Sequence, residues 1–141
     1  MHTLKSYLSG ICLLFSIALT AQKTNSASDL PVTSKTEVSS QALEYLFQSK
    51  GKIAIDLAPG FRLEGNIQNK SNHGTEVVSI LIKLENRNGS ILTLTRSMDT
   101  FGHIFYSGNL LKLHDSEGLI LIEKEHHYYF VETLQRFLVS E

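Results

Sequence analysis

Apolar and polar residues alternate from Ile53 to Val131, and this rhythm constrains the fold more than any other feature of the chain. A period of two places neighbouring side chains on opposite faces of an extended strand, so pleated backbone can turn it into a dry interior. The clearest example follows the Pro59-Gly60 turn, where the two kinds of residue alternate from Phe61 to Gln68. The pattern predicts a mainly β domain.

Short turns divide this span into about seven predicted strands. Asn88-Gly89 is typical of a tight hairpin because both residues accept positive φ angles, and Asp115 to Gly118 forms a second turn. We therefore expect an antiparallel meander of about seven strands that forms a small barrel or a strongly curved sheet. The predicted strands are residues 52–57, 61–68, 77–85, 91–98, 104–113, 119–123 and 128–133.

Three further details are expected within this span and after it. Asn69 to Gly74 is predicted to be a polar loop between two strands. Gly108 interrupts its strand where the apolar register changes faces, which predicts a bulge or a sharp bend. The last segment, Leu134 to Val139, is expected to form a helical turn or an edge strand.

One short helix is expected before the sheet. Ser39 or Ser40 can cap its first N–H groups, and Gly51 can end it in a left-handed turn. Its apolar stripe consists of Ala42, Leu43, Leu46 and Phe47. A helix of about ten residues is unstable alone, so we expect it to pack on the sheet.

Two predicted strands are apolar on both faces. They are Val77 to Leu84 and Leu119 to Ile122. Because exposed Leu and Ile side chains favour burial by roughly 1.5–3 kcal/mol each, both faces of these strands require a cover. The helix and the residues from Leu134 to Val139 are the candidates within the chain.

The N-terminus has the order of properties of a secretory signal. His2 and Lys5 form a basic start, and Tyr7 to Leu19 is an apolar stretch that ends in the small residues Thr20-Ala21. The apolar stretch is shorter than the about 20 residues of a membrane-spanning helix. We therefore expect a cleavable signal peptide over residues 1–21, with no permanent membrane span after its removal.

A polar segment separates this signal from the domain. Residues 22–38 are rich in Ser, Thr and Asn and contain Pro31, so we expect a flexible leader, followed by a single β-rich domain over residues 39–141. Cys12 is the only cysteine and lies within the signal, so the mature domain is expected to be cysteine-free. The expected location is secreted or periplasmic, in the envelope of a bacterium.

Charge excludes one class of partner. The chain has 13 Lys and Arg residues against 14 Asp and Glu residues, and the basic residues form no stripe. Nucleic-acid binding needs clustered cations to neutralise phosphates, so it is not expected.

No residue pattern points to catalysis, a metal or a cofactor. His73, His103, His114, His126 and His127 lack the spacing of a zinc site. The chain also lacks a Gly-x-Ser-x-Gly elbow and a phosphate-binding glycine loop. We therefore expect no catalytic, metal or cofactor-binding residues.

Aromatic residues of the last third suggest a contact surface. The candidates are Phe105, Tyr106, Tyr128 and Tyr129, since adjacent aromatics on a strand place at least one ring on each face. Cross-strand packing within the domain is the alternative for the same residues. The expected function is a non-enzymatic binding or assembly module that acts on a protein partner or on itself.

Two other functions remain open. The first is a small barrel that carries an apolar ligand or lipid among its inward side chains, and the second is a small secreted hydrolase. The inward side chains that would line such a barrel are Phe61, Leu63, Ile67, Val78, Ile80, Ile82, Leu92 and Leu94.

Overall fold

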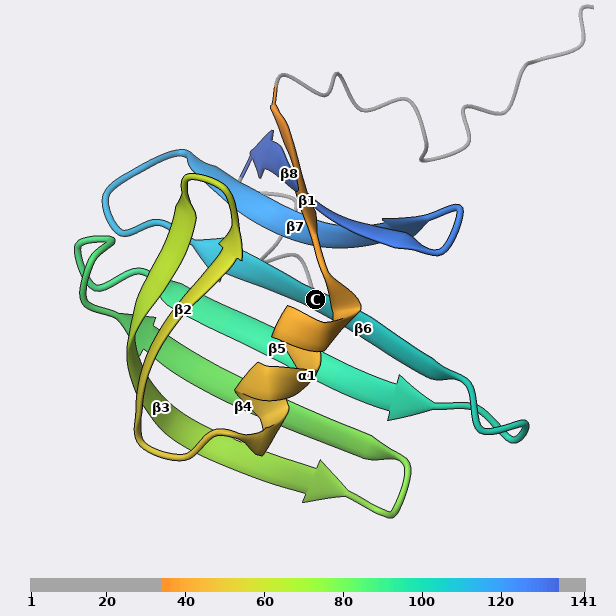
Figure 1. The fold of residues 1–141 in the computed structure, drawn as a ribbon. Coiled ribbons are helices and arrows are strands. Elements are labelled where there is room, and N and C mark those ends of the chain that lie inside the picture. The colour runs from red at the N-terminus through yellow and green to blue at the C-terminus, as the bar shows by residue number, and fades with distance from the viewer. Residues whose placement is uncertain (1–33, 135–141) are drawn as a thin grey trace, which may run out of the picture.

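The computed structural model describes residues 34–134 and confirms the mainly β architecture. Eight antiparallel strands within these residues form one sheet that curves into a nearly closed barrel, with one short helix on its inner side (Figure 1). The strands are β1 (Lys35–Val38), β2 (Lys52–Ala58), β3 (Phe61–His73), β4 (Val77–Leu84), β5 (Ile91–Met98), β6 (Ile104–Leu111), β7 (Glu117–Lys124) and β8 (His127–Leu134). The helix is α1 (Ser40–Gln48).

The sheet is a meander that closes through its first strand. Strands β2 to β8 each pair with their neighbours in sequence, and β1 then pairs with β8 in the register Lys35↔Val131 to Val38↔Tyr128. The order is therefore β1-β8-β7-β6-β5-β4-β3-β2, and the edge strands β1 and β2 lie in contact. This contact nearly closes the barrel.

Strand β1 corrects one prediction. It consists of the last four residues of the segment 22–38, which the sequence predicts to be a flexible leader. Only Val38 among them is buried, so the apolar signal is too short to identify a strand. The free edge of β8 supplies the backbone hydrogen bonds that order these residues. Residues 1–33, which contain the predicted signal and the rest of the leader, lie outside the described residues.

Helix α1 begins as the sequence predicts. Ser39 is the N-cap, and its hydroxyl accepts a hydrogen bond from the Ala42 N–H at 3.1 Å. The helix ends at Gln48 through an extended Ser49, and Gly51 takes its positive φ of 69° two residues later. Gly51 therefore turns the chain into β2 and does not itself cap the helix.

The core lies between α1 and the concave face of the sheet. The helix buries Leu43, Leu46 and Phe47 against the inward side chains of the strands. The fully buried members of the sheet include Leu63, Ile80, Ile82, Leu84, Leu92, Leu94 and Leu110. The apolar stripe of the helix thus packs on the sheet, as the sequence predicts.

β4 and β7 are apolar on both faces, and their inner faces are covered better than their outer faces. The inward residues of β4 and β7 belong to the core, whereas the outward Leu81, Ile120 and Ile122 are partly exposed. Helix α1 covers the inner face of the sheet and leaves the outer face without helical cover within residues 34–134. Leu134 ends β8, and the remaining residues of the predicted tail lie outside the described residues.

Strand β3 runs further than predicted. The segment Asn69 to His73, which reads as a polar loop, continues β3 and pairs with the first half of β4 after a bulge between Ile67 and Asn69. Its side chains are mostly exposed at the rim of the barrel, and polar residues are compatible with a strand at exposed positions. One of them, Lys70, donates a hydrogen bond to the Phe47 carbonyl at the end of α1.

The predicted bulge at Gly108 is wrong. The pairing of β5 and β6 continues without a shift through Leu94↔Gly108. A Cβ atom at Gly108 would lie 2.3 Å from the carbonyl oxygen of Thr93, so the glycine permits a close approach of two backbones. Strand β7 pairs with β6 only from Gly108 to Leu111, and the first half of β6 parts from it (Figure 1). The β5–β6 hairpin consequently projects from the barrel.

Replacing this glycine tests the close approach. In Gly108→Ala the new methyl group would strike the Thr93 carbonyl and Leu94 Cδ2, which lies at 2.7 Å. We expect the free energy of unfolding, measured by urea denaturation, to fall by about 3 kcal/mol because the strands must separate. In the control Gly74→Ala no heavy atom lies within 4 Å, and the positive φ alone costs about 1 kcal/mol. Equal losses in the two variants would contradict the close approach.

Candidate functional site

The four aromatic residues of the predicted contact surface do not lie together. Tyr106 and Tyr128 are 8% and 6% exposed and belong to the core, with their rings in an edge-to-face arrangement at 5.4 Å. They are not available to a partner, which corrects the prediction for these two residues. Phe105 precedes Tyr106 on β6, and Tyr129 follows Tyr128 on β8. Both therefore point to the outer side of the sheet.

Tyr106 takes part in a polar cluster that holds α1 to the sheet. Its hydroxyl donates to Glu44 Oε2 of the helix at 2.6 Å, and Arg96 of β5 donates to the same oxygen at 3.0 Å. We call Glu44, Arg96 and Tyr106 the helix latch. Lys70 adds a third contact, because its hydrogen bond to the Phe47 carbonyl places a cation at the C-terminal end of the helix.

The contacts of the helix latch shift the pKa values of Glu44 and Tyr106. Desolvation raises the pKa of Glu44, but the hydrogen bond from Tyr106 and the charge and hydrogen bond of Arg96 outweigh it, and the pKa falls below its usual value. Desolvation and the neighbouring Glu44 carboxylate raise the pKa of Tyr106 to about 12. The tyrosine is therefore a proton donor in a hydrogen bond and the glutamate an anion, as a structural contact requires.

Tyr129 is engaged at the edge of the barrel. The ammonium group of Lys35 on β1 lies 3.4 Å from the centre of its ring, which is a cation–π contact. His127 and Glu37 are in hydrogen-bond contact beside it, with 2.7 Å between Nδ1 and Oε1. These contacts join β1 to β8, so Tyr129 serves the closure of the barrel.

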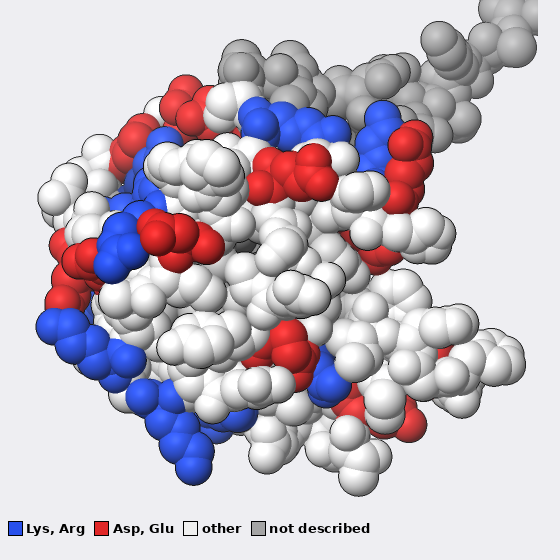
Figure 2. Space-filling model, viewed as in Figure 1, with Lys and Arg blue, Asp and Glu red and all other residues white. Residues whose placement is uncertain are grey.

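The most exposed large hydrophobic residue among residues 34–134 lies at the tip of the β5–β6 hairpin. Phe101 is 86% exposed, while Ile104 and Phe105 at the start of β6 are 39% and 41% exposed. Phe101, Ile104 and Phe105 all lie at this tip, and we call them the hairpin patch, although Ile104 and Phe105 are successive strand residues and point to opposite faces. In the space-filling view the lobe at this end of the molecule is mostly uncharged (Figure 2).

Asp99 fixes the turn that carries Phe101. Its Oδ1 accepts hydrogen bonds from the backbone N–H groups of Phe101 and His103 at 2.8 and 2.9 Å, and its Oδ2 lies 3.0 Å from His103 Nδ1. Desolvation opposes ionisation of Asp99, but these contacts lower its pKa overall. Gly102 closes the turn with a φ of 84° and donates its N–H to the Asp99 carbonyl. The phenyl ring is thus presented by an ordered turn.

The sequence predicts Phe105 for a contact surface but neither Phe101 nor Ile104. One signal was present, because Phe101 stands directly before a glycine in a turn that begins with Asp99. A turn residue belongs to neither face of a strand, so strand alternation cannot bury its side chain. Large apolar residues at such positions are exposed unless a neighbouring element covers them.

Three of the five histidines within residues 34–134 each lie beside one carboxylate. His103, His126 and His127 lie within 4 Å of Asp99, Glu123 and Glu37 respectively. Within residues 34–134 no group of three or more His, Cys, Asp or Glu side chains converges as a metal site would. No helix in the same part of the chain is long and apolar enough to span a membrane.

Comparison with known proteins adds no relative. No family model, no curated protein and no solved structure matches the chain. The geometry of the described residues is therefore the basis for assigning a function.

Removing the Tyr106 hydroxyl tests the helix latch. In Tyr106→Phe we expect the free energy of unfolding at about pH 7 to fall by about 1.5 kcal/mol, because Glu44 loses a charge-assisted hydrogen bond. The pKa of Glu44 is lower in the folded chain, so its stabilisation is complete above the ordinary value of 4.5 and is lost as the pH falls. The variant should therefore lose less stability than the wild-type protein on acidification.

Urea denaturation at neutral and at acidic pH measures both effects. Tyr45→Phe is the control, since Tyr45 lies on the exposed side of the helix and its side chain is 52% exposed. The control should match the wild-type protein at each pH. A Tyr106→Phe curve that runs parallel to the wild-type curve from neutral to acidic pH would contradict the role given to the hydroxyl.

Proposed function

We propose that the protein is a non-enzymatic binding or assembly module that contacts a partner protein through the hairpin patch. One observation carries the proposal: Phe101 is 86% exposed on a turn that three contacts of Asp99 keep in one conformation. An ordered turn loses little conformational entropy on binding, so the burial of the ring is available as binding energy. Burying a phenylalanine side chain stabilises a complex by roughly 1.5–3 kcal/mol.

The composition of the hairpin patch favours a protein as the partner. An aromatic anchor with apolar neighbours is typical of the centre of a protein interface, where the partner supplies an apolar pocket. The turn carries Asp99 and His103 and no lysine or arginine, so it lacks the cations that attract membrane surfaces and nucleic acids. A second copy of the chain is the simplest such protein.

The place of action follows from the N-terminal sequence. Residues 1–21 have the pattern of a secretory signal, and we propose that the domain acts in the periplasm or outside the cell, in the envelope of a bacterium. A cysteine-free mature domain does not depend on the redox state of that compartment. Its stability comes from packing instead.

The carrier of an apolar ligand ranks second. Such a carrier needs space between its inward side chains, whereas the buried inward residues of β3, β4 and β5 pack in one core with Leu43, Leu46 and Phe47 of the helix. Native mass spectrometry of protein isolated from its host separates the two proposals, because a carrier retains the additional mass of a lipid. A hydrolase ranks third, since the titratable side chains Glu44, Arg96 and Tyr106 are engaged with one another in holding the helix.

Replacing the anchor residue tests the proposed interface. Phe101→Ser should bind the partner captured from the native envelope with a Kd higher by roughly tenfold or more. Its stability should stay within about 0.5 kcal/mol of wild type because the side chain makes few internal contacts. Tyr45→Ser is the matched control, since it removes an exposed aromatic side chain from α1 and should leave binding unchanged.

Sedimentation of the purified protein identifies self-association. A dimer that dissociates in Phe101→Ser and persists in Tyr45→Ser would identify a second copy as the partner. A wild-type protein that stays monomeric and captures nothing, or a Phe101→Ser variant that binds as tightly as wild type, would overturn the proposal.

A further inference from the structure

The first half of β6 is an edge of the sheet that no strand among residues 34–134 covers. On one side β6 pairs with β5 along its whole length, from Ile104 to Leu111. On the other side β7 pairs only with Gly108 to Leu111, so residues 104–107 have β5 as their single neighbour. Figure 1 shows the β5–β6 hairpin diverging from the β7–β8 hairpin at this point. The backbone of residues 104–107 is therefore open on one side.

One hydrogen bond shows which groups this edge presents. The N–H of Met98 donates to the Glu76 carbonyl at 2.9 Å, on the β4 side of β5. Met98 therefore does not bond to β6, and Met98 and Ile104 form a non-hydrogen-bonded pair. The direction alternates along a strand, so the N–H and C=O groups of both Ile104 and Tyr106 point away from β5 into the open edge.

One of these groups already has a partner inside the domain. Desolvation raises the pKa of Tyr128, and a hydrogen bond from the backbone of Tyr106 acts in the opposite direction. A hydrogen bond that lowers the pKa of a hydroxyl comes from a donor, so the Tyr106 N–H is the engaged group. The edge therefore offers a donor and an acceptor at Ile104 and an acceptor at Tyr106.

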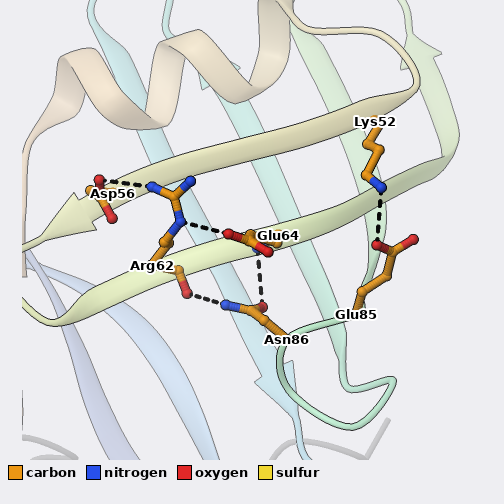
Figure 3. Close-up of polar contacts among 6 residues, drawn as sticks. All are labelled: Lys52, Asp56, Arg62, Glu64, Glu85 and Asn86. Carbon is orange, nitrogen blue, oxygen red and sulfur yellow. Dashed lines mark hydrogen bonds and ion pairs between the residues drawn. The ribbon is translucent and has the colours of Figure 1, made fainter.

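The strands at the two ends of the sheet carry charges, and the open edge of β6 does not. The charged residues are Lys35 and Glu37 on β1 and Lys52 and Asp56 on β2. Both charges of β2 take part in ion pairs, with Glu85 at 3.4 Å and with Arg62 at 3.0 Å (Figure 3). Residues 104–111 contain no charge and no proline. Charges and prolines protect edge strands from pairing with another chain, so the edge of β6 lacks the usual protection.

The edge is complementary to a second copy of itself. In an antiparallel pair about a two-fold axis at Phe105, Ile104 of each copy lies opposite Tyr106 of the other. The Ile104 N–H then donates to the Tyr106 carbonyl on each side of the axis. Phe105 is 41% exposed and meets its counterpart at the axis, where cross-strand aromatic pairs stabilise a sheet. The edge thus supplies both the donor and the acceptor that it requires.

The same pairing gives the tip of the hairpin a contact. The two hairpins run in opposite directions, so Phe101 of one copy reaches the level of Asn109 in the other. Asn109 pairs there with Ile120 of β7, whose side chain points to the outer side and is partly exposed. The phenyl ring and the outer face of β7 would cover each other, and the structure gives this face no helical cover within residues 34–134.

We propose that two copies of the chain pair through the open edge of β6 and join their sheets in the order β5-β6-β6-β5. The inference rests on the proposed function, because it names the partner of the hairpin patch and the way in which that partner binds. Phe105 lies at the two-fold axis, and Phe101 of each copy packs on β7 of the other.

A disulfide across the axis tests the register. Cys12 is the only cysteine of the chain, so Phe105→Cys in a Cys12→Ser background carries a single thiol. Opposite residues of a non-hydrogen-bonded pair have Cα atoms about 4.5 Å apart, which a disulfide can bridge. We expect this full-length variant to oxidise to a covalent dimer. Ser97→Cys is the matched control, because Ser97 pairs with Phe105 on β5 and two such residues lie about 14 Å apart across the dimer.

Removing the donor tests the hydrogen bonds between the copies. Ile104→Pro removes an N–H that makes no bond to β5, at the first residue of β6, where proline is tolerated. The Kd of the dimer, measured by sedimentation equilibrium, should rise by roughly tenfold or more because a hydrogen bond is lost on each side of the axis. Ile104→Ala shortens the same side chain but retains the N–H, so its Kd should rise less.

The outcomes separate this inference from the proposed function. A wild-type monomer that binds another protein through Phe101 would overturn the pairing and leave the proposed function intact, whereas a monomer that binds nothing would overturn both. Equal cross-linking of Phe105→Cys and Ser97→Cys, or equal Kd values of Ile104→Pro and Ile104→Ala, would overturn the pairing through β6. If Ile104→Pro does not fold, the cross-linking comparison decides alone.

Discussion

The packing of α1 against the inner face of the sheet is the interaction on which the rest of the structure depends. Leu43, Leu46 and Phe47 supply its apolar part, and three buried side chains of this size contribute roughly 5–9 kcal/mol. That is comparable to the whole stability of an ordinary domain. The latch of Glu44, Arg96 and Tyr106 adds direction, because it fixes which face of the helix meets the sheet.

A filled interior moves the available binding surface to the ends of the barrel. At one end β6 parts from β7 before Gly108, and the β5–β6 hairpin projects with Phe101 at its tip. At the other end the β4–β5 and β6–β7 turns border an open hollow of about 220 Å³. The same two strands thus connect the exposed tip that carries Phe101 to this hollow, and the sheet between them belongs to the core.

Most of the fold could be predicted because its signals are local. Period two identified the seven strands from β2 to β8, and a serine before an apolar stripe identified α1. Strand β1 was missed because it is polar and only the edge of β8 orders it. Two of the four predicted contact residues, Tyr106 and Tyr128, are buried, because their hydroxyl groups reach Glu44 and Glu123 within the domain. Glu44 lies 62 residues before Tyr106 and leaves no local pattern, whereas Glu123 is only five residues from Tyr128 and faces it across the β7–β8 hairpin.

Native-state hydrogen exchange tests the position of α1 most directly, since it measures the free energy of opening for each amide. The amides of Leu46 and Phe47 should exchange only through global unfolding, with the same opening free energy as those of Ile82 and Leu94 in the centre of the sheet. An opening free energy for the helix well below that of the sheet, independent of denaturant, would show that α1 moves as a lid. The interior would then be open to a ligand, and the account of a filled barrel would be wrong.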